Sequence, residues 1–297
     1  MPPNNLAKID PWLRDIIVDP LSKEPLTESV DGTHLLSPYG RKYPVVNGIY
    51  DLRLLNNDTT PEQQLWKEGQ EHYESWSKNG HAEYTREHYK LELEGVANVY
   101  REIPIEGRCL DIGGHQGRLR AFLQPDQEYV SCDPFINVLD SIRESSNLTE
   151  MYPFLLHPIN FLSCEGEFLP FASSSFDVVH MRSVIDHLRN PELAINEAYR
   201  TLRFPGALVI GIYVHGGKFG HTTVQERLKE TIKGLISHTG IAKYRDHHIW
   251  HPSFLELIGL IESCGFFIDK VHWQEKTGES TCYIKALKVD ELKRQHK

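Results

Sequence analysis

The sequence predicts an α/β protein in which strands and helices alternate along the chain and form a doubly wound sheet. Three observations support this prediction. From Arg108 onward, short apolar runs typical of buried strands alternate with helical segments. A turn that contains three glycines directly follows the first of these strands. The chain has 297 residues, which is enough for one large domain and one small one.

The alternating region begins with an expected strand at Cys109–Ile112 and an expected helix at Arg118–Leu123. Later strands are expected at Tyr129–Cys132, Phe176–His180, Ala207–Val214, Phe266–Trp273 and Thr281–Val289. Further helices are expected at Pro191–Leu202 and Ser253–Cys264, and each is followed by a glycine that can end it, Gly206 and Gly265. Residues 215–252 interrupt the alternation with a histidine-rich, partly helical insertion.

The chain before Arg108 has two parts of different composition. Residues 12–54 are rich in Pro, Gly and Ser, which predicts short strands joined by tight turns. Thr60, Pro61 and Glu62 then have the pattern of a helix start, and aromatic residues recur every three or four positions. The expected divisions are a small β module at 1–58, a helical lid segment at 59–107, and a main domain at 108–297 with a substrate insertion at 215–252.

Charge and cysteine content favour some classes of function over others. The net charge of −9 argues against binding to nucleic acid, because proteins that bind phosphates usually present a basic face. The five cysteines form no CxxC pair, so neither a zinc ribbon nor a disulfide framework is expected. The chain has no apolar signal stretch and no apolar run of about 18 residues, the length that spans a membrane. We expect a cytoplasmic enzyme with a small-molecule substrate.

The glycine-rich turn starts where the first predicted strand ends, at Asp111, and contains Gly113, Gly114 and Gly117. Ligands of such sheets bind at the carboxyl ends of the strands, and glycine lets the backbone approach them closely. Asp133 follows the second strand about 20 residues later, where an acid can accept hydrogen bonds from ribose hydroxyls. The two features favour a nucleotide-like ligand over a plain strand connection with a solvated acid.

Motifs downstream of Asp133 indicate the class of ligand by resemblance. They are, in order, Cys164-Glu165-Gly166-Glu167-Phe168-Leu169-Pro170-Phe171, Ser175-Phe176-Asp177-Val178-Val179-His180, Asp186-His187-Leu188, Glu197-Ala198-Tyr199-Arg200-Thr201-Leu202 and Phe204-Pro205-Gly206-Ala207. With the glycine-rich turn they resemble the class I S-adenosylmethionine (SAM)-dependent methyltransferases, in the branch that includes ubiquinone-biosynthesis and natural-product enzymes. The resemblance spans residues 108–214. It implies a Rossmann-like seven-stranded sheet, SAM as the cofactor and S-adenosylhomocysteine as the product.

The resemblance also implies which residues bind the cofactor. They are Asp111, Gly113, Gly114 and Gly117 for the methionine part of SAM, Asp133, Pro134, Glu165 and Gly166 for ribose and adenine, and Met181 and Arg182 near the sulfonium. His115 departs from the family, which has glycine at that position.

The N-terminal module resembles the small zinc-ribbon-like domain of tRNA-methyltransferase activator proteins. The likeness rests on residues 19–26 and 36–49. In metal-binding forms of that domain, cysteines occupy the positions of Asp19 and Ser22, and another pair precedes the Tyr-Pro found here at Tyr43. Because this chain lacks those cysteines, we expect a small β fold without zinc that docks on the main domain.

His187 is the first candidate for a catalytic group. The methyl group of SAM is already activated, so the main tasks are alignment and exclusion of water, but an oxygen or nitrogen acceptor can also need a base. Some of the resembling O-methyltransferases have a catalytic histidine at this position, and Asp186 could orient it. The alternative is that His187 only caps a local turn.

No metal site is expected in the insertion, although it is rich in histidine. Its histidines are His215, His221, His238, His247, His248 and His251. Adjacent side chains in the segment 246–251 point apart, and no CxxC or HExxH framework supports a metal. Before the main domain, aromatic residues could close over the cofactor or simply pack in the core; these are Trp66, Tyr73, Trp76, Tyr84 and Tyr89.

Three functions remain open from the sequence. The first is a methyltransferase that moves a methyl group from SAM to a small molecule, with oxygen as the preferred acceptor atom. The second is an RNA methyltransferase, since ribosomal RNA guanine methyltransferases also carry an N-terminal zinc ribbon; the missing cysteines and the net charge of −9 oppose it. The third is a non-catalytic SAM-fold partner or scaffold protein, which His115 keeps open.

Overall fold

The structure is a computed structural model that describes residues 6–54, 64, 67–72, 74–75, 84–219, 248–274 and 280–290. The predicted helix start at 60–62 lies outside the described residues, as do Trp66, Tyr73, Trp76, His221, His238 and His247. Residues 67–72 are helical, in agreement with the predicted helical segment.

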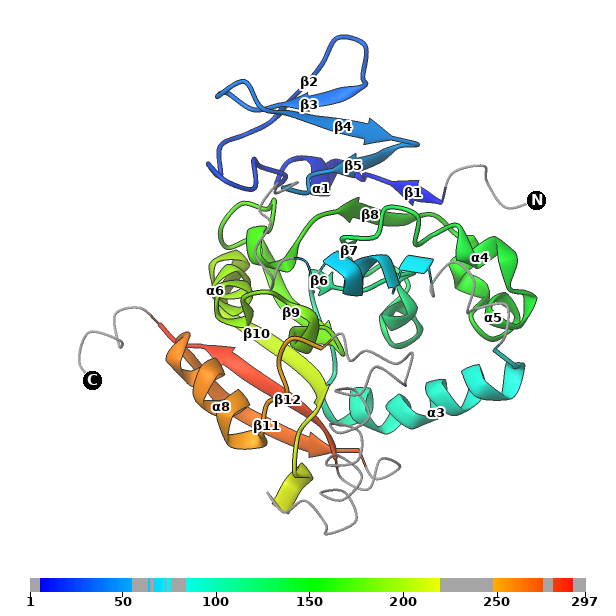
Figure 1. Cartoon of the computed structure of the whole chain (residues 1–297), viewed down its shortest axis with the longest axis vertical. Helices are drawn as coiled ribbons and strands as arrows, with labels where there is room; N and C mark the ends of the chain where they lie inside the picture. Colours follow the sequence, from blue (N-terminus) through cyan, green and yellow to red (C-terminus); the bar gives the residue numbers. More distant parts are fainter. Residues whose placement is uncertain are drawn as a thin grey trace.

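The central sheet runs in the order β8-β7-β6-β9-β10-β12-β11 (Figure 1). Its strands are β6 (Cys109–Ile112), β7 (Tyr129–Asp133), β8 (Ile159–Ser163), β9 (Phe176–Arg182), β10 (Leu202–Tyr213), β11 (Phe266–Trp273) and β12 (Thr281–Lys288). The strands from β8 to β10 are parallel, and β12 is antiparallel to both β10 and β11. The chain reverses its direction of travel across the sheet between β8 and β9, on either side of β6. The predicted Rossmann-like sheet of seven strands is confirmed.

Helices cover both faces of this sheet (Figure 1). One face carries α3 (Arg86–Glu102), α4 (Ser141–Glu144) and α5 (Ser146–Met151), and the other carries α6 (Pro191–Thr201) and α8 (Phe254–Ser263). Among the described residues, no helix is both long enough and apolar enough to span a membrane.

Two of these helices begin and end where the sequence predicts. Pro191 opens α6, and the side chain of Asn190 accepts a hydrogen bond from the Leu193 amide. Ser253 and Glu256 form a reciprocal capping box at the start of α8, which satisfies two amides that a helix start otherwise leaves unpaired.

Three details differ from the prediction. β8 is absent from the predicted strands, although its five residues are all buried. The segment after the glycine-rich turn forms a short 3-10 helix, Arg118–Phe122, in place of an α-helix. Gly206 does not end a helix, because α6 leads directly into β10 and Gly206 lies within that strand, beside a register shift between Leu202 and Ala207.

The N-terminal residues extend the central sheet at its β8 edge. They form β1 (Ala7–Lys8), α1 (Pro11–Arg14), β2 (Thr27–Glu28), β3 (His34–Leu36), β4 (Lys42–Val46) and β5 (Ile49–Asp51). Both β1 and β5 pair in parallel with β8, at successive positions along that strand. The predicted short strands are therefore present, and they form one continuous sheet with the main domain (Figure 1).

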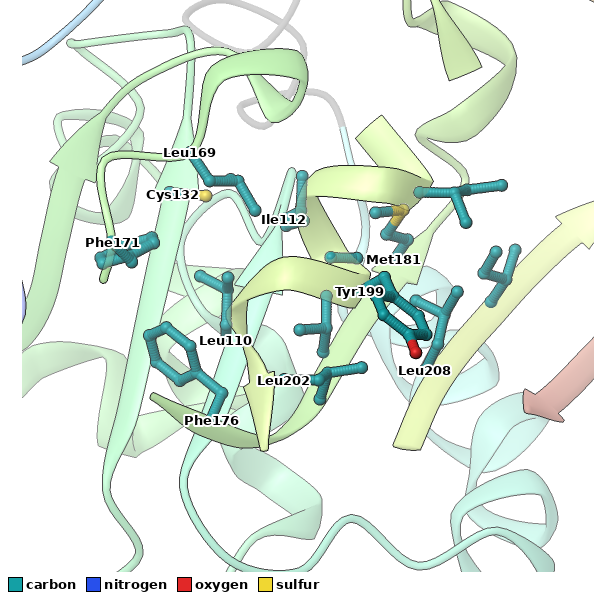
Figure 2. Close-up of a cluster of buried hydrophobic side chains, with 14 of the residues drawn as sticks. Leu110, Ile112, Cys132, Leu169, Phe171, Phe176, Met181, Tyr199, Leu202 and Leu208 are labelled. Carbon is teal, nitrogen blue, oxygen red and sulfur yellow. The ribbon is translucent and has the colours of Figure 1, made fainter. Parts of the chain in front are cut away.

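Alternate residues of the central strands supply two buried clusters, one on each face. Leu110 and Ile112 of β6 belong to the cluster that contains residues of α6 and α8. Cys109 of the same strand belongs to the cluster that contains Val96 and Val99 of α3. Figure 2 shows part of the first cluster, in which Met181, Leu202 and Leu208 pack around the same strands. This packing on both faces fixes where the carboxyl ends of β6, β7 and β9 lie.

Candidate functional site

Two adjoining cavities lie at the carboxyl ends of the central strands. The larger, of about 380 Å³, is lined among others by Gly113, Asp133, Glu165, Arg182 and His187. The smaller, of about 230 Å³, contains Asp111, Gly114 and Tyr100 in its wall. The cavities share Gly113, His115, Arg118, Arg182 and Ser183. They meet at the switch point of the sheet, where ligands of doubly wound folds bind.

Asp133 ends β7 with its side chain almost fully buried. Its Oδ1 accepts a hydrogen bond of 3.0 Å from the Phe135 amide, and the His115 amide also donates to the carboxyl. Burial outweighs these hydrogen bonds and raises the pKa of Asp133 from its ordinary value of 3.8 to about 7. A buried acid with unfilled acceptor capacity at a cavity wall is suited to bind a pair of hydroxyl groups.

Glu165 follows the end of β8 by two residues and also lines the larger cavity. Its Oε2 accepts a 3.0 Å hydrogen bond from the Leu54 amide, which belongs to the segment directly after β5. Burial raises the pKa of this carboxyl as well. Gly166 and Pro134 also line this cavity, so the predicted adenosine-binding residues lie together.

The glycine-rich turn needs its glycines for close packing. Gly113 has a φ of +64°, and a Cβ at this position would collide with the Val184 side chain. A Cβ on Gly114 would lie 2.6 Å from the Asp111 carboxylate and from Ser131 Oγ. His115 has a φ of +51° and lines both cavities, so the residue that departs from the predicted motif lies in the cavity wall.

Asp111 is held in a buried network that the sequence analysis did not identify. Its two carboxylate oxygens bond to Tyr129 Oη at 2.6 Å and to His180 Nδ1 at 2.7 Å. Nε2 of His180 lies 2.9 Å from the hydroxyl of Tyr100, which comes from α3. These contacts fix the carboxylate at the base of the turn, and they join residues too distant in sequence for a local pattern to reveal.

Two arginines lie where the cavities meet. Arg118 forms an ion pair with Glu92, and Arg182 Nη1 lies 3.4 Å from the other oxygen of the same carboxylate. Burial opposes the charge of Arg182, but Tyr283, Tyr100 and Glu92 together raise its pKa above the ordinary value. A partly exposed guanidinium at this position is suited to bind a ligand carboxylate.

His187 lines the larger cavity, and the structure places His248 of the insertion beside it. The rings of these two histidines stack with centroids 4.4 Å apart. Nε2 of His187 lies 3.9 Å from Asp186 Oδ1, which is beyond hydrogen-bond distance. These two atoms therefore form no hydrogen bond, and both the orienting role of Asp186 and the base role of His187 stay predictions.

Three predicted site residues line neither cavity. Gly117 has a φ of +79°, and a Cβ there would collide with Ile159, so it serves the packing of the turn against β8. Met181 is completely buried in the core beside β6 (Figure 2). Asp186 lies behind His187 and outside the cavity lining. The other predicted cofactor residues line one or both cavities.

A third cavity, of about 450 Å³, lies between the N-terminal strands and the main domain. Four basic residues line it: Arg41, Lys42, Arg53 and Arg189. Arg53 forms a short ion pair with Asp51 and donates a 3.1 Å hydrogen bond to the Pro134 carbonyl. The wall of this cavity therefore adjoins the predicted adenosine site.

The fold and these cavities agree with the comparison to known families. Residues 110–210 match the methyltransferase domain family, which covers the turn, Asp133, Glu165 and His187. An uncharacterized protein of Methanocaldococcus jannaschii is 32% identical over 124 residues, or 42% of this chain and 51% of that protein. The chain thus spans about half the length of this curated relative.

Two solved structures are similar to this chain at low sequence identity. A chain of the complex between the Haloferax volcanii Trm112 methyltransferase activator and its methyltransferase has a TM-score of 0.50 and 13% identity, covering 73% of this chain and 98% of that chain. A SAM-dependent methyltransferase of Thermotoga maritima, described as a possible histamine N-methyltransferase, has a TM-score of 0.47 and 20% identity, covering 77% and 100%.

Proposed function

We propose that the chain is a SAM-dependent methyltransferase that transfers a methyl group to a small-molecule acceptor, with oxygen as the preferred acceptor atom and nitrogen as the second choice. The observation that carries the proposal is the pair of joined cavities at the ends of β6 and β7, inside the segment that matches the methyltransferase domain family. Proteins of that class use a sulfonium-activated methyl group, which SAM supplies when bound.

The residues of the two cavities fit the parts of SAM. The buried Asp133 would accept hydrogen bonds from both ribose hydroxyls, and Glu165 would accept one from the adenine amino group. Gly113 would let the backbone lie against the ligand, because any side chain there is excluded. Arg182 would pair with the carboxylate of the methionine part. These residues would bind SAM and fix its orientation. The apolar wall that includes Val184 and Leu188 would exclude water from the cavity.

Isothermal titration calorimetry of the full chain with SAM and with S-adenosylhomocysteine tests this proposal. We expect binding of one ligand per chain at micromolar concentration. An absence of binding at millimolar ligand would reject the enzyme and would favour the non-catalytic partner or scaffold protein. Transfer of labelled methyl groups from SAM to fractions of a metabolite extract would then identify the acceptor.

An RNA methyltransferase is the second candidate, and the basic cavity beside the N-terminal strands favours it. Arg41, Lys42, Arg53 and Arg189 could contact phosphates there, despite the overall charge of −9. The N-terminal module, which we propose is a zinc-ribbon-like fold without metal, would then form part of the RNA surface. Tight RNA binding that weakens steeply with salt would favour this candidate, whereas no RNA binding at about 50 mM salt would reject it.

A further inference from the structure

Asp186, His187 and His248 meet beside the larger cavity although they come from distant parts of the chain. One potential ligand atom of each residue lies within 4.8 Å of the others. Nε2 of His187 and Nε2 of His248 lie 3.9 and 3.6 Å from the two oxygens of the Asp186 carboxylate. Both histidines line the cavity, and the two rings stack at an angle of 28°. Both imidazoles therefore have one nitrogen close to the same carboxylate.

Backbone contacts hold this cluster together. The Asp186 carbonyl accepts hydrogen bonds of 2.8 and 3.2 Å from the amides of Ile249 and Trp250, the two residues after His248. Asp186 and His187 themselves belong to a 3-10 turn that follows β9, in which the His187 amide donates to the Val184 carbonyl at 2.9 Å. The approach of His248 to Asp186 is thus set by the chain path and does not depend on long, flexible side chains.

The distances in the cluster are too long for hydrogen bonds and suited to a shared ion. Separations of 3.6 and 3.9 Å exceed the usual limit of about 3.2 Å for a hydrogen bond between nitrogen and oxygen. Ligands about 2.1 Å from one tetrahedral ion lie about 3.4 Å apart, so the three ligand atoms, which lie within 4.8 Å of one another, would move closer and the stacked rings would turn to share an ion. Asp186 Oδ1 is buried and has no hydrogen-bond partner among the described residues, which leaves acceptor capacity that an ion would use.

We infer that Asp186, His187 and His248 bind one divalent transition-metal ion, such as Zn²⁺, at the wall of the larger cavity. Two imidazoles and one carboxylate are a ligand set that suits zinc and iron, and three protein ligands leave at least one coordination position open, as in catalytic sites. His187 and His248 line the cavity, so the open position would face it. The sequence predicts no metal site, because the pattern of histidines within the insertion does not support one. The proposed site instead joins one histidine of the insertion to Asp186 and His187.

The role of this ion rests on the proposed function, whereas its binding does not. A hydroxyl group of the acceptor would occupy the open position, and coordination would lower the pKa of that hydroxyl. Its proton would pass to bulk water. The oxygen would then form a bond to the methyl carbon of SAM as the bond between carbon and sulfur breaks, with release of S-adenosylhomocysteine. In this role His187 is a metal ligand, which replaces its use as a general base.

The test measures metal binding on the untagged full chain after treatment with a chelator. Zn²⁺ is titrated by calorimetry, its content is measured by mass spectrometry after dialysis, and Co²⁺ replaces Zn²⁺ for visible absorption spectra. The variants are His248→Ala and Asp186→Asn. His251→Ala is the matched control, because His251 lies close to His248, with ring centroids 5.7 Å apart, but is not one of the three ligands.

We expect one Zn²⁺ per wild-type chain and a Co²⁺ spectrum of low coordination number. His248→Ala and Asp186→Asn should weaken Zn²⁺ binding about 100-fold or more, since changes even behind metal ligands cost 10- to 100-fold. His251→Ala should bind like the wild type. The inference is overturned if the wild type binds no stoichiometric ion, or if His248→Ala binds Zn²⁺ as tightly as the wild type. Circular dichroism shows that each variant is folded, and calorimetry with S-adenosylhomocysteine on the chelator-treated proteins separately reports the proposed function.

Discussion

Replacing Asp133 with asparagine should make the empty protein more stable and its cofactor site weaker. The carboxyl is buried at 4% exposure, and burial raises its pKa from 3.8 to about 7. The folded state therefore holds the proton more tightly than the unfolded state between these values. Stability from the protonated carboxyl is fully present below pH 3.8, falls as pH rises, and is lost above pH 7. An asparagine, which carries no charge at any pH, avoids this loss.

The size of the gain follows from the pKa change. A shift from 3.8 to about 7 corresponds to about 4 kcal/mol at pH 8 and to about 2 kcal/mol at pH 5, because one pKa unit is about 1.4 kcal/mol. These are upper limits for Asp133→Asn, because the amide adds a donor that must also be satisfied. Loss of a charged acceptor for a ribose hydroxyl should at the same time weaken S-adenosylhomocysteine binding by about 1.5–3 kcal/mol.

Urea unfolding at pH 5 and pH 8, together with calorimetry at pH 8, measures both quantities. Asp140→Asn, a change at an exposed acid, is the control and should alter each by less than about 0.5 kcal/mol. The reasoning is refuted if Asp133→Asn destabilises the protein at pH 8, or if the variant binds S-adenosylhomocysteine as tightly as the wild type.

Three further predictions concern the same cavities. The affinity of the wild type for S-adenosylhomocysteine should fall about tenfold from pH 8 to pH 6 in calorimetry, as the Asp133 carboxylate of the empty site takes up a proton, and Asp133→Asn should remove this dependence. Gly113→Ala should reduce stability by about 1–3 kcal/mol in urea unfolding, whereas Gly259→Ala, in an open position on α8, should be neutral or stabilising. Arg182→Met should weaken SAM binding at least tenfold, whereas the affinity for 5′-methylthioadenosine, which lacks the carboxylate, should be nearly unchanged. An equal loss of affinity for both ligands would contradict the proposal that Arg182 pairs with the carboxylate of SAM.

The sequence predicts the central fold well where local patterns decide it. β6 and β11 have their predicted bounds, because a buried strand of a parallel sheet is a short apolar run with turn residues beside it. The predicted cofactor residues of the turn and of β7 lie together because parallel strands end at one edge. β8 was missed, since its five residues include the polar Asn160, whose side chain bonds to Asp10 and to the Tyr129 carbonyl.

The parts of the site that were not predicted depend on contacts between distant residues. The hydrogen bonds that join Asp111, His180 and Tyr100 link three separate elements, and no spacing in the sequence reveals them. In the sequence, His248 stands only among its neighbours in the insertion. Its true partners, Asp186 and His187, become visible only once the path of the chain after His248 is known.

Because the N-terminal strands are attached to β8, ligand binding at the predicted cofactor site depends on whether these strands are folded against the main domain. The Leu54 amide, just beyond β5, donates to Glu165, and Arg53 donates to the Pro134 carbonyl. A ligand that requires these groups in place binds only when the N-terminal strands are docked, so its binding must stabilise that docking, by an amount that grows with ligand concentration. Amide hydrogens of β4 and β5 should therefore exchange more slowly with solvent when S-adenosylhomocysteine is bound, although no residue of those strands touches the larger cavity.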